Sequence, residues 1–274
     1  INLTNTIVSG NNGVVANGLT NTIDVTGGSV TGTTGNGIQA TGSNNTVTLT
    51  NTAVVGATHG VAVNGLINNT VNVTGGSVTG TSGNGIQAIG LDNEITLTGA
   101  TVSGGSGGVV ASGANNTVNV TGGSVTGTTG SGIQTTGVDN QITLTGATVS
   151  GSNGIAANGL NTTIGVTGGS VTGTEGDGIR AYSSGVMGQG GTTAITVGGA
   201  NVTGAQNGIS AVNIGLGADA DTSVEANNGQ ITGGTGSGIS AITAAIGTGQ
   251  VQDAQISVEG SANISGGLSG ILAG

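Results

Sequence analysis

Few side chains in this sequence could carry out acid–base, nucleophilic or metal chemistry. The 274 residues contain no Cys, one His, and one Lys or Arg against 11 Asp and Glu. Glu175 and Asp177 could act as the two carboxyl groups that a glycoside hydrolase holds roughly 5 to 10 Å apart. Both stand where related segments carry Thr, Ser or Asn, so we interpret them as variant turn residues. His59 replaces an Asn of these segments with no Asp or Cys nearby in sequence, and we interpret it as a structural turn residue too.

The single cation and one run of carboxylates are the remaining candidates. Arg180 is the only candidate for a cationic base, but it stands where other segments carry Gln, so we interpret it as a solvent-facing strand residue. Asp219, Asp221 and Glu225 alternate like the start of a Ca²⁺ loop, but the later Gly and the distant bidentate Glu of an EF-hand are missing. We interpret them as a solvated acidic loop. The sequence therefore predicts a protein that is not an enzyme, with no catalytic residue, no metal site and no cofactor.

The composition excludes several folds and partners. Gly accounts for 62 residues, yet Pro is absent, which excludes collagen. Hydrophobic residues make up 34% of the chain and charged residues 4%, the opposite of the balance in disordered chains. Nucleic acids and anionic membranes are recognised through Lys and Arg, whereas this chain has a net charge of −10. We therefore expect neither nucleic acid nor an anionic membrane surface as a partner.

The strongest pattern is an internal repeat of 22 to 24 residues that contains three apolar anchors. The first anchor begins an alternating run, the second follows seven or eight residues later, and the third comes directly after a Gly. The first anchors are Ile1, Ile23, Val47, Val71, Ile95, Val118, Ile142, Ile164, Ile195, Val224 and Ile256. The second anchors are Val8, Val30, Val54, Val78, Val102, Val125, Val149, Val171, Val202, Ile231 and Ile264. The third anchors are Val14, Ile38, Val61, Ile86, Val109, Ile133, Ile155, Ile179, Ile209, Ile239 and Ile271.

This repeat predicts an all-β fold. Short alternating segments between Gly- and Asn-rich turns are typical of strands. Three short strands in each of about 11 repeats, with only Val, Ile and Leu to fill an interior, predict a right-handed parallel β-helix, or β-solenoid. At about 4.8 Å per coil, the rod would be roughly 50 Å long. Residues 1–181 are expected to form regular coils, and residues 182–274 coils of the same domain with longer corner insertions.

Two turn positions carry further expectations. One Asn precedes the first strand in six successive repeats, and stacked Asn side chains are expected to extend the hydrogen-bond ladder into this corner. These residues are Asn21, Asn45, Asn69, Asn93, Asn116 and Asn140. The Gly before each third anchor is expected to adopt a positive φ. The spacing from second to third anchor alternates between successive repeats, so we interpret the duplicated unit as a pair of coils.

From the eighth repeat onward the corner after the third strand is longer. The insertions comprise residues 182–193, 212–223 and 242–255. Because the three insertions occur at the same corner of successive coils, we expect them to stack into a protruding patch. Binding residues concentrate on loops that a rigid scaffold carries, so this patch is the expected binding surface. Tyr182 and Met187 are the only Tyr and the only Met of the chain, and Arg180 lies at the edge of this region. We predict these three as ligand-binding residues.

Seven successive repeats carry Thr at one outward position of the first strand. They are Thr26, Thr50, Thr74, Thr98, Thr121, Thr145 and Thr167. Thr is favoured on exposed strands, and stacked Thr pairs stabilise sheets. A flat Thr array could also bind ice, although Glu94, Gln141 and Gly165 interrupt the rows beside it.

Three recurring phrases carry a resemblance to a known class of protein. Gly-Gly-Ser-Val-Thr-Gly-Thr, Gly-Asn-Gly-Ile-Gln-Ala and Asn-Thr-Val-Thr-Leu-Thr are similar to the β-helical passenger regions of bacterial autotransporters and related large secreted surface adhesins. The resemblance covers the whole chain and rests on core and turn positions. It implies an extracellular location at the bacterial cell surface and a non-catalytic structural stalk or adhesive shaft, with a host or surface receptor as a partner.

Three alternatives to this role stay open. They are a self-assembling extracellular filament subunit, a carbohydrate-active β-helix enzyme, and an ice-binding protein that uses the Thr face. The filament alternative follows from the open ends of the β-helix, since unpaired strand edges recruit other strands and repeat arrays normally carry polar caps. We expect either neighbouring coils of a longer chain or end-to-end self-association with identical copies. Long unbranched rods of the purified chain would indicate the latter.

Overall fold

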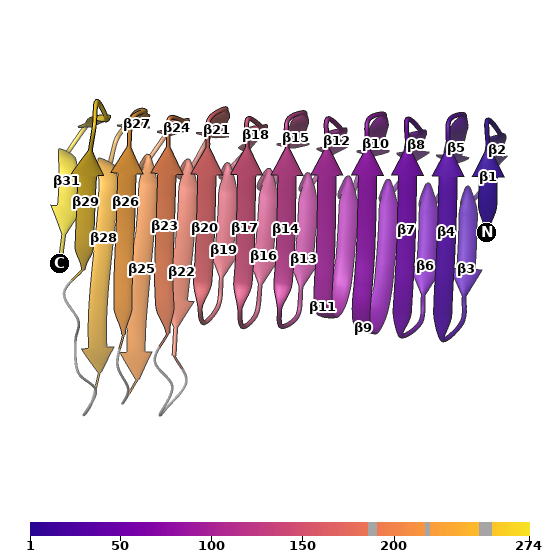
Figure 1. The fold of residues 1–274 in the computed structure, drawn as a ribbon, viewed down its shortest axis with the longest axis horizontal. Coiled ribbons are helices and arrows are strands. Elements are labelled where there is room, and N and C mark those ends of the chain that lie inside the picture. Colours follow the sequence, from indigo (N-terminus) through magenta and orange to yellow (C-terminus); the bar gives the residue numbers. More distant parts are fainter. Residues whose placement is uncertain (186–190, 217–219, 247–253) are drawn as a thin grey trace.

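The computed structural model describes residues 1–185, 191–216, 220–246 and 254–274 (Figure 1). Within these ranges the chain forms 31 β-strands. The strands pair in parallel from β1 and β4 at one end to β28 and β31 at the other. No helix occurs in these ranges, and therefore none that is long and apolar enough to cross a membrane. The predicted all-β solenoid is confirmed.

Each coil contributes one strand to each of three faces, which we call A, B and C in chain order. Face A contains β1 (Asn2–Thr4), β4 (Thr20–Thr26), β7 (Asn44–Thr50), β14 (Asn116–Thr121), β17 (Asn140–Thr145), β20 (Thr162–Thr167), β23 (Thr192–Gly198), β26 (Asp221–Asn227) and β29 (Gln255–Glu259). Face B contains β2 (Ile7–Gly10), β5 (Ser29–Gly32), β8 (Ala53–Gly56), β10 (Ser77–Gly80), β12 (Thr101–Gly104), β15 (Ser124–Gly127), β18 (Thr148–Gly151), β21 (Ser170–Gly173), β24 (Asn201–Gly204), β27 (Gln230–Gly233) and β30 (Asn263–Gly266). Face C contains β3 (Val14–Asn17), β6 (Ile38–Thr41), β13 (Val109–Ser112), β16 (Ile133–Thr136), β19 (Ile155–Asn158), β22 (Ile179–Ser184), β25 (Ile209–Leu216), β28 (Ser237–Ile246) and β31 (Ser269–Ala273). Two strands, β9 (Val61–Thr74) and β11 (Ile86–Thr98), pass through the corner from face C to face A.

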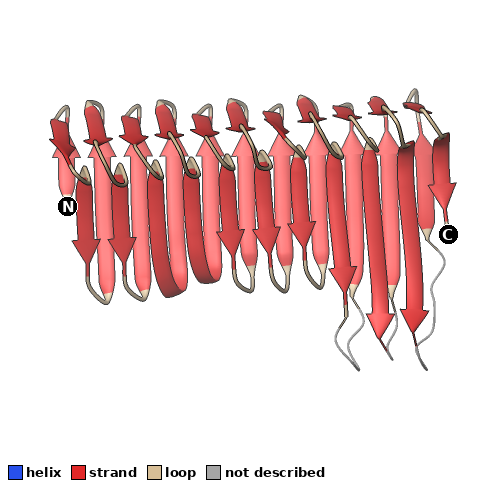
Figure 2. Cartoon of the chain, turned by 180° about the vertical axis from the view of Figure 1, so that it is seen from behind, coloured by secondary structure: helices blue, strands red, loops and turns tan. Residues whose placement is uncertain are grey.

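The coil is right-handed. In Figure 1 the nearer strands run upward and the fainter, farther strands run downward, while the chain advances from right to left. Figure 2, drawn from behind, shows the same sense of rotation, with the chain advancing from left to right. This is the handedness expected for connections between parallel strands.

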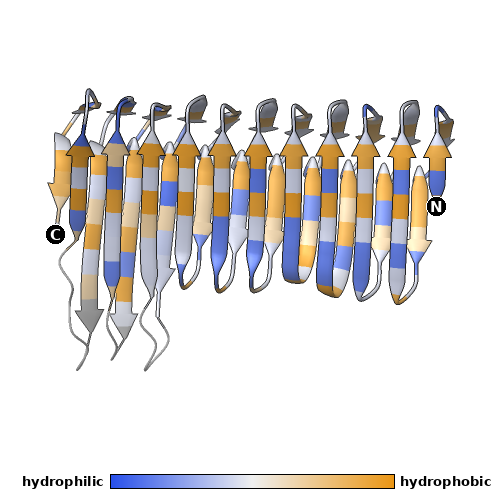
Figure 3. Ribbon diagram, viewed as in Figure 1, coloured by the Kyte–Doolittle hydropathy of each residue, from blue (hydrophilic) through white to orange (hydrophobic). Residues whose placement is uncertain are grey.

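All three series of anchors form the interior columns that the repeat predicts. On face A, Val47 pairs with Val71, which pairs with Ile95 in the following coil. These three side chains are 0% exposed, and Figure 3 shows the matching apolar bands at the same height in successive coils. In the end coils the anchors are less covered, because a neighbour lies on one side only. Buried aliphatic side chains stacked on their counterparts are therefore the main source of stability of the shaft.

The predicted Asn column is also confirmed. The side-chain amide of Asn93 donates to Oδ1 of Asn116 in the next coil at 2.8 Å, and to the carbonyl of Gly90 at 2.7 Å. The same amide-to-amide bond, 2.8–2.9 Å long, joins the other successive members of the column from Asn21 to Asn140. Beyond Asn140 the column continues with Thr162, which pairs with Thr193. We call this column the Asn ladder.

The expectation of a positive φ at the Gly before each third anchor is wrong. Gly37 is not among the residues with positive φ. A Cβ on Gly37 would instead lie 2.6 Å from Cγ1 of Val54 and 2.6 Å from the carbonyl oxygen of Gly60, both in the next coil. Glycine is therefore needed here because the neighbouring coil packs directly against the backbone.

Alternate coils differ at the corner between faces A and B. Gly76 has a φ of 68°, and a Cβ there would lie 2.3 Å from the carbonyl oxygen of Thr52 in the preceding coil. In the coils between such glycines the corner carries a buried Thr or Ala, as at Thr52 and Ala100. The two forms of the corner fit against each other, which supports a pair of coils as the structural unit.

Candidate functional site

The three insertions lie side by side at the corner between faces C and A of the last coils. We call them arms 1, 2 and 3 (residues 182–193, 212–223 and 242–255), and Figures 1 and 2 show the ends of β22, β25 and β28, which belong to their described parts, projecting beyond the regular shaft. The face C strands lengthen from 4 residues in β19 to 6, 8 and 10 residues in β22, β25 and β28. They stay paired in register, so that the arms extend the sheet where they are described.

An apolar column runs along the outer surface at the base of the arms. Tyr182 pairs with Val212, which pairs with Ile242. Tyr182 and Val212 are partly exposed and Ile242 is 37% exposed. Two of the predicted binding residues, Arg180 and Tyr182, lie on this outer side of β22, and the third, Met187, lies outside the described residues.

Arg180 lies beside a shallow polar depression of about 290 Å³ at the corner between faces B and C. Glu175, Asp177 and Gln206 line it together with Arg180. Asp177 is buried, and its Oδ1 accepts hydrogen bonds from the backbone N–H and the side-chain amide of Asn207, both at 2.9 Å. Asp177 therefore lies in a turn, where its carboxylate accepts hydrogen bonds from the next coil. The depression offers a cation and carboxylates for hydrogen bonds to a polar ligand.

His59 belongs to the same corner column, several coils earlier. Its backbone N–H donates to Oδ1 of Asn36 at 3.2 Å, and its Nδ1 accepts the backbone N–H of Asn84 at 2.9 Å. The imidazole therefore supplies the acceptor that an Asn side chain supplies in other coils, as in the bond from Gly107 N–H to Asn84 Oδ1 at 3.0 Å. Burial lowers the pKa of His59 below its ordinary value. A proton on Nδ1 would also face the N–H of Asn84, so the neutral ring is the form that fits.

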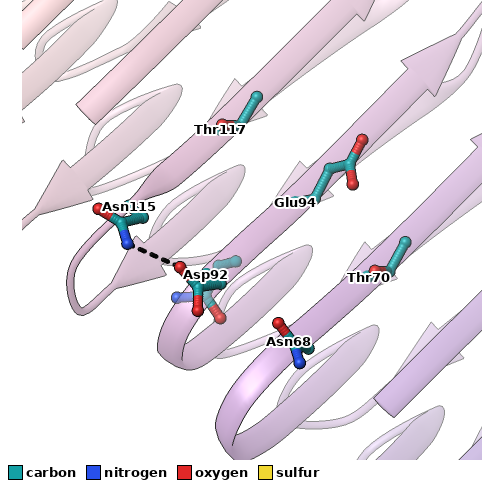
Figure 4. Close-up of a pocket in the computed structure, with 7 residues that line it drawn as sticks. Asn68, Thr70, Asp92, Glu94, Asn115 and Thr117 are labelled. Atoms are coloured by element: carbon teal, nitrogen blue, oxygen red, sulfur yellow. Dashed lines mark hydrogen bonds between the residues drawn. The ribbon is translucent and has the colours of Figure 1, made fainter. Parts of the chain in front are cut away.

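An acidic groove on face A was missed by the sequence analysis. Figure 4 shows Asp92 and Glu94 beside Asn115, with the side-chain amide of Asn115 donating to Oδ1 of Asp92 at 2.7 Å. The groove has a volume of about 360 Å³. One coil pair further on, Asn161 donates in the same way to Asp139 at 2.8 Å.

The missed signal is an alternation of Asn and Asp at one corner position. The members of this column have φ between 53° and 59°, a region that Asn and Asp tolerate better than most residues. They are Asn68, Asp92, Asn115, Asp139 and Asn161. The carboxylates of the column are thus held in place by amides of the following coil.

The three carboxylates weighed as Ca²⁺ ligands, Asp219, Asp221 and Glu225, are only partly described. Asp221 and Glu225 are exposed on one side of β26. Four residues along a strand correspond to about 13 Å, too far to share one ion. No group of three or more His, Cys, Asp or Glu side chains gathers within the described ranges. Asp219 lies outside them, so the interpretation of the three residues as a solvated acidic loop stays an untested prediction.

The Thr column of face A is present in register. Thr50 pairs with Thr26 on one side and with Thr74 on the other, and the column continues to Thr167. Next in line after Thr167 is Gly198, which ends the Thr column. The ice-binding alternative stays a prediction.

In comparisons with known proteins, no protein-family model, no curated protein and no solved structure matches the chain. The class of protein is therefore defined by the fold alone, as a parallel β-helix with three arms on one corner.

Proposed function

We propose that this chain is a non-catalytic structural rod, the stalk or adhesive shaft of a bacterial cell-surface or secreted protein, and that its arms form the contact surface. The observation that carries the proposal is the paired column of Tyr182, Val212 and Ile242 at the base of the arms. The regular shaft repeats the same turns from coil to coil. The arms are the one place in the described ranges where successive coils depart together from the short corner.

The chemistry of the arm surface supports contact with a macromolecule. Tyr182 is the only aromatic residue of the chain, and Arg180 is its only Lys or Arg. Tyr and Arg are enriched among residues that dominate binding energy at interfaces. Both lie on the outer side of β22, next to the aliphatic surface of β25 and β28.

The proposal is tested by shortening the arms to the corner of the seventh coil. Gly-Leu-Asn joins Asn158 to Thr162 there, and the register aligns these residues with Tyr182 and Thr193. In the variant, Gly-Leu-Asn replaces residues 183–192, 213–221 and 243–253. We expect the far-ultraviolet circular dichroism of a β-helix to be retained, and beads coated with the variant to lose adhesion to a panel of immobilised glycans and matrix proteins that the full chain binds.

A second variant, Tyr182→Ser, keeps the three insertions at full length and removes only the aromatic side chain. It is expected to weaken adhesion without changing the circular dichroism spectrum. Adhesion that survives both arm shortening and Tyr182→Ser would assign the contact to the shaft and contradict the proposal.

A further inference from the structure

The same C-to-A corner that carries the arms also carries an exposed apolar surface on the shaft. In most of the first seven coils the residue after the corner Gly is apolar, and Leu19, Leu66, Leu91 and Val138 at this position are exposed. We call the exposed set the corner ridge. It consists of Leu19 (81% exposed), Leu66 (76%), Ile67 (39%), Ile89 (43%), Leu91 (46%) and Val138 (40%). Between Leu19 and Leu66 the ridge encloses a groove of about 530 Å³ whose floor includes Gly42 and Gly65.

The backbone of the corner fixes the ridge in place. Gly42 has a φ of 152°, and a Cβ on it would collide with the carbonyl oxygen of Gly18 in the preceding coil. The corner glycines Gly18, Gly42 and Gly65 therefore stack closely, and the side chains of Leu19 and Leu66, which follow two of them, are exposed. In the seventh coil the corresponding residue, Leu160, is only 8% exposed. Its Cδ2 lies against Gly191 of arm 1, so a polypeptide segment already covers this position where the shaft meets the arms.

Carboxylates flank the ridge on the face A side. Asp92 follows Leu91 and Asp139 follows Val138 in sequence, and Glu94 lies on the same strand as Asp92. The only Lys or Arg of the chain, Arg180, lies in β22 of the eighth coil, where it lines the depression at the B-to-C corner. A second copy of this chain would bring identical carboxylates against these, which is unfavourable. The complementary partner carries Lys or Arg beside an apolar stripe.

The spacing of the ridge side chains along the rod indicates the secondary structure of that partner. Leu19 and Leu66 lie two coils apart, as do Leu91 and Val138, and two coils correspond to about 9.6 Å. Seven residues of an α-helix rise about 10.5 Å, whereas an extended strand advances about 6.6 Å between side chains on one side. A helix parallel to the rod therefore matches the ridge. The first six coils would accommodate about 16 helical residues.

We propose that the corner ridge is a docking site for a basic amphipathic α-helix of another protein. Its apolar stripe packs on Leu19, Leu66 and Leu91, and its Lys or Arg side chains lie in the groove of Asp92 and Glu94. The corner ridge is separate from the arm surface, and this proposal does not depend on the function proposed for the arms.

The test uses a fluorescein-labelled synthetic peptide of three heptads, with Leu at a and d and Lys at most other positions. A peptide of the same composition with scattered Leu residues is the control. We expect fluorescence anisotropy at physiological salt to show binding of the striped peptide to the full chain about tenfold or more tighter than that of the scattered peptide.

Two variants divide the apolar from the charged contribution. Leu19→Asn/Leu66→Asn/Leu91→Asn is expected to weaken binding of the striped peptide about tenfold or more. Asp92→Asn/Glu94→Gln/Asp139→Asn is expected to weaken it and to flatten its salt dependence. Its substitutions follow residues already at these positions in other coils, such as Asn115 and Gln141. Val55→Thr, which removes an exposed apolar side chain on face B, is expected to leave binding unchanged.

Three results would overturn the proposal. The first is equal binding of the striped and scattered peptides, and the second is unchanged binding by the triple Leu variant; either would show attraction by charge alone. The third is a dimer of the full chain in sedimentation velocity that the triple Leu variant abolishes, which would make the ridge an interface between copies.

Discussion

The shaft and the arms use the same parallel pairing but differ in what the paired strands enclose. In the shaft, aliphatic columns fill the interior, and in the Asn ladder each side-chain amide donates to the Asn of the next coil and to backbone carbonyls of the corner. In the arms, the inward positions of the face C strands are Ser183, Asn213 and Thr243, which stack on one another. Four buried side-chain oxygens there lack a partner within the described ranges: Ser183 Oγ, Thr193 Oγ1, Asn213 Oδ1 and Thr243 Oγ1.

The shaft and the arms are therefore stabilised by different interactions, although their strands belong to the same sheet. Buried aliphatic surface stabilises the shaft, whereas the arms depend on backbone pairing and on Asn213, whose side-chain amide donates to the carbonyls of Gly191 and Asp221. Unpartnered buried polar groups are costly. The described strand ends of the arms should therefore open more readily than the coils that carry them.

The largest effect is expected from a charge in a shaft column. Val118 is 0% exposed between Ile95 and Ile142, so Val118→Asp places an unpaired carboxylate in the core and should cost about 3–5 kcal/mol of unfolding free energy. Thermal unfolding by circular dichroism measures it. Asn119→Asp, one residue later and facing outward between Thr96 and Thr143, is the control and should change the melting temperature little. An unchanged melting temperature for Val118→Asp would contradict the register.

The next largest effect is expected from a gap in the Asn ladder. Asn93→Ala removes the acceptor of the Asn69 amide and the donor to Asn116 Oδ1. Loss of these buried bonds should cost about 2–4 kcal/mol. Hydrogen exchange should show the loss most strongly in the adjacent coils, because repeat arrays transmit stability between neighbours. Asn93→Thr, which copies Thr162 of the later column, should cost less; equal losses for both would show that the amide bonds matter little.

A smaller effect is expected from protonation of His59. Because burial lowers its pKa in the folded state, the unfolded chain binds more protons between the lowered folded pKa and the ordinary value of about 6.5. Stability should therefore be fully present above about pH 6.5 and should fall as the pH drops below that value.

Denaturation midpoints of the wild type and of His59→Asn, measured between neutral and mildly acidic pH, test this prediction. The variant keeps an acceptor at the corner but cannot titrate, so its midpoint should fall less on acidification. Parallel curves for the two proteins would assign the pH dependence to the carboxylates.

The smallest global effect is expected in the arms. Asn213→Ala should leave the melting temperature nearly unchanged, since the shaft carries most of the stability. It should nevertheless speed amide exchange in the arm portions of β25 and β26, where the bonds to Gly191 and Asp221 are lost. Ser183→Ala removes an unpartnered hydroxyl and should leave exchange unchanged or slower. Faster exchange in Ser183→Ala would show that this hydroxyl has a role in holding the arm.

The sequence predicts the lateral arrangement well because period-2 alternation and an uninterrupted repeat specify which side chains face inward and which lie above one another. Val118 and Asn93 were both placed correctly on this basis. Contacts along the axis were harder to predict. The steric reason for Gly37 depends on how closely the next coil approaches its Cα, and the carboxylate of Asp92 is held by an amide 23 residues later.

The candidate binding surface was predicted in part. The insertions identify the corner, and Arg180 and Tyr182 lie on its outer side as expected. The corner ridge escaped prediction because a Leu after a Gly at a turn has the same pattern as a Leu that begins a strand. Only the stacked glycines beneath Leu19 and Leu66 show that these side chains point outward.

The alternating A-to-B corner has a consequence for how such a rod can change length in evolution. A coil with Gly at this corner fits against one with Thr or Ala, as Gly76 fits against Thr52. Loss or gain of one coil would bring two like corners together, whereas loss or gain of two coils would restore the fit. Unequal recombination between the near-identical segments around Gly28, Gly76, Gly123 and Gly169 exchanges coils in pairs. It would therefore alter the reach of the arms in steps of about 9.6 Å while keeping them on the same side of the rod.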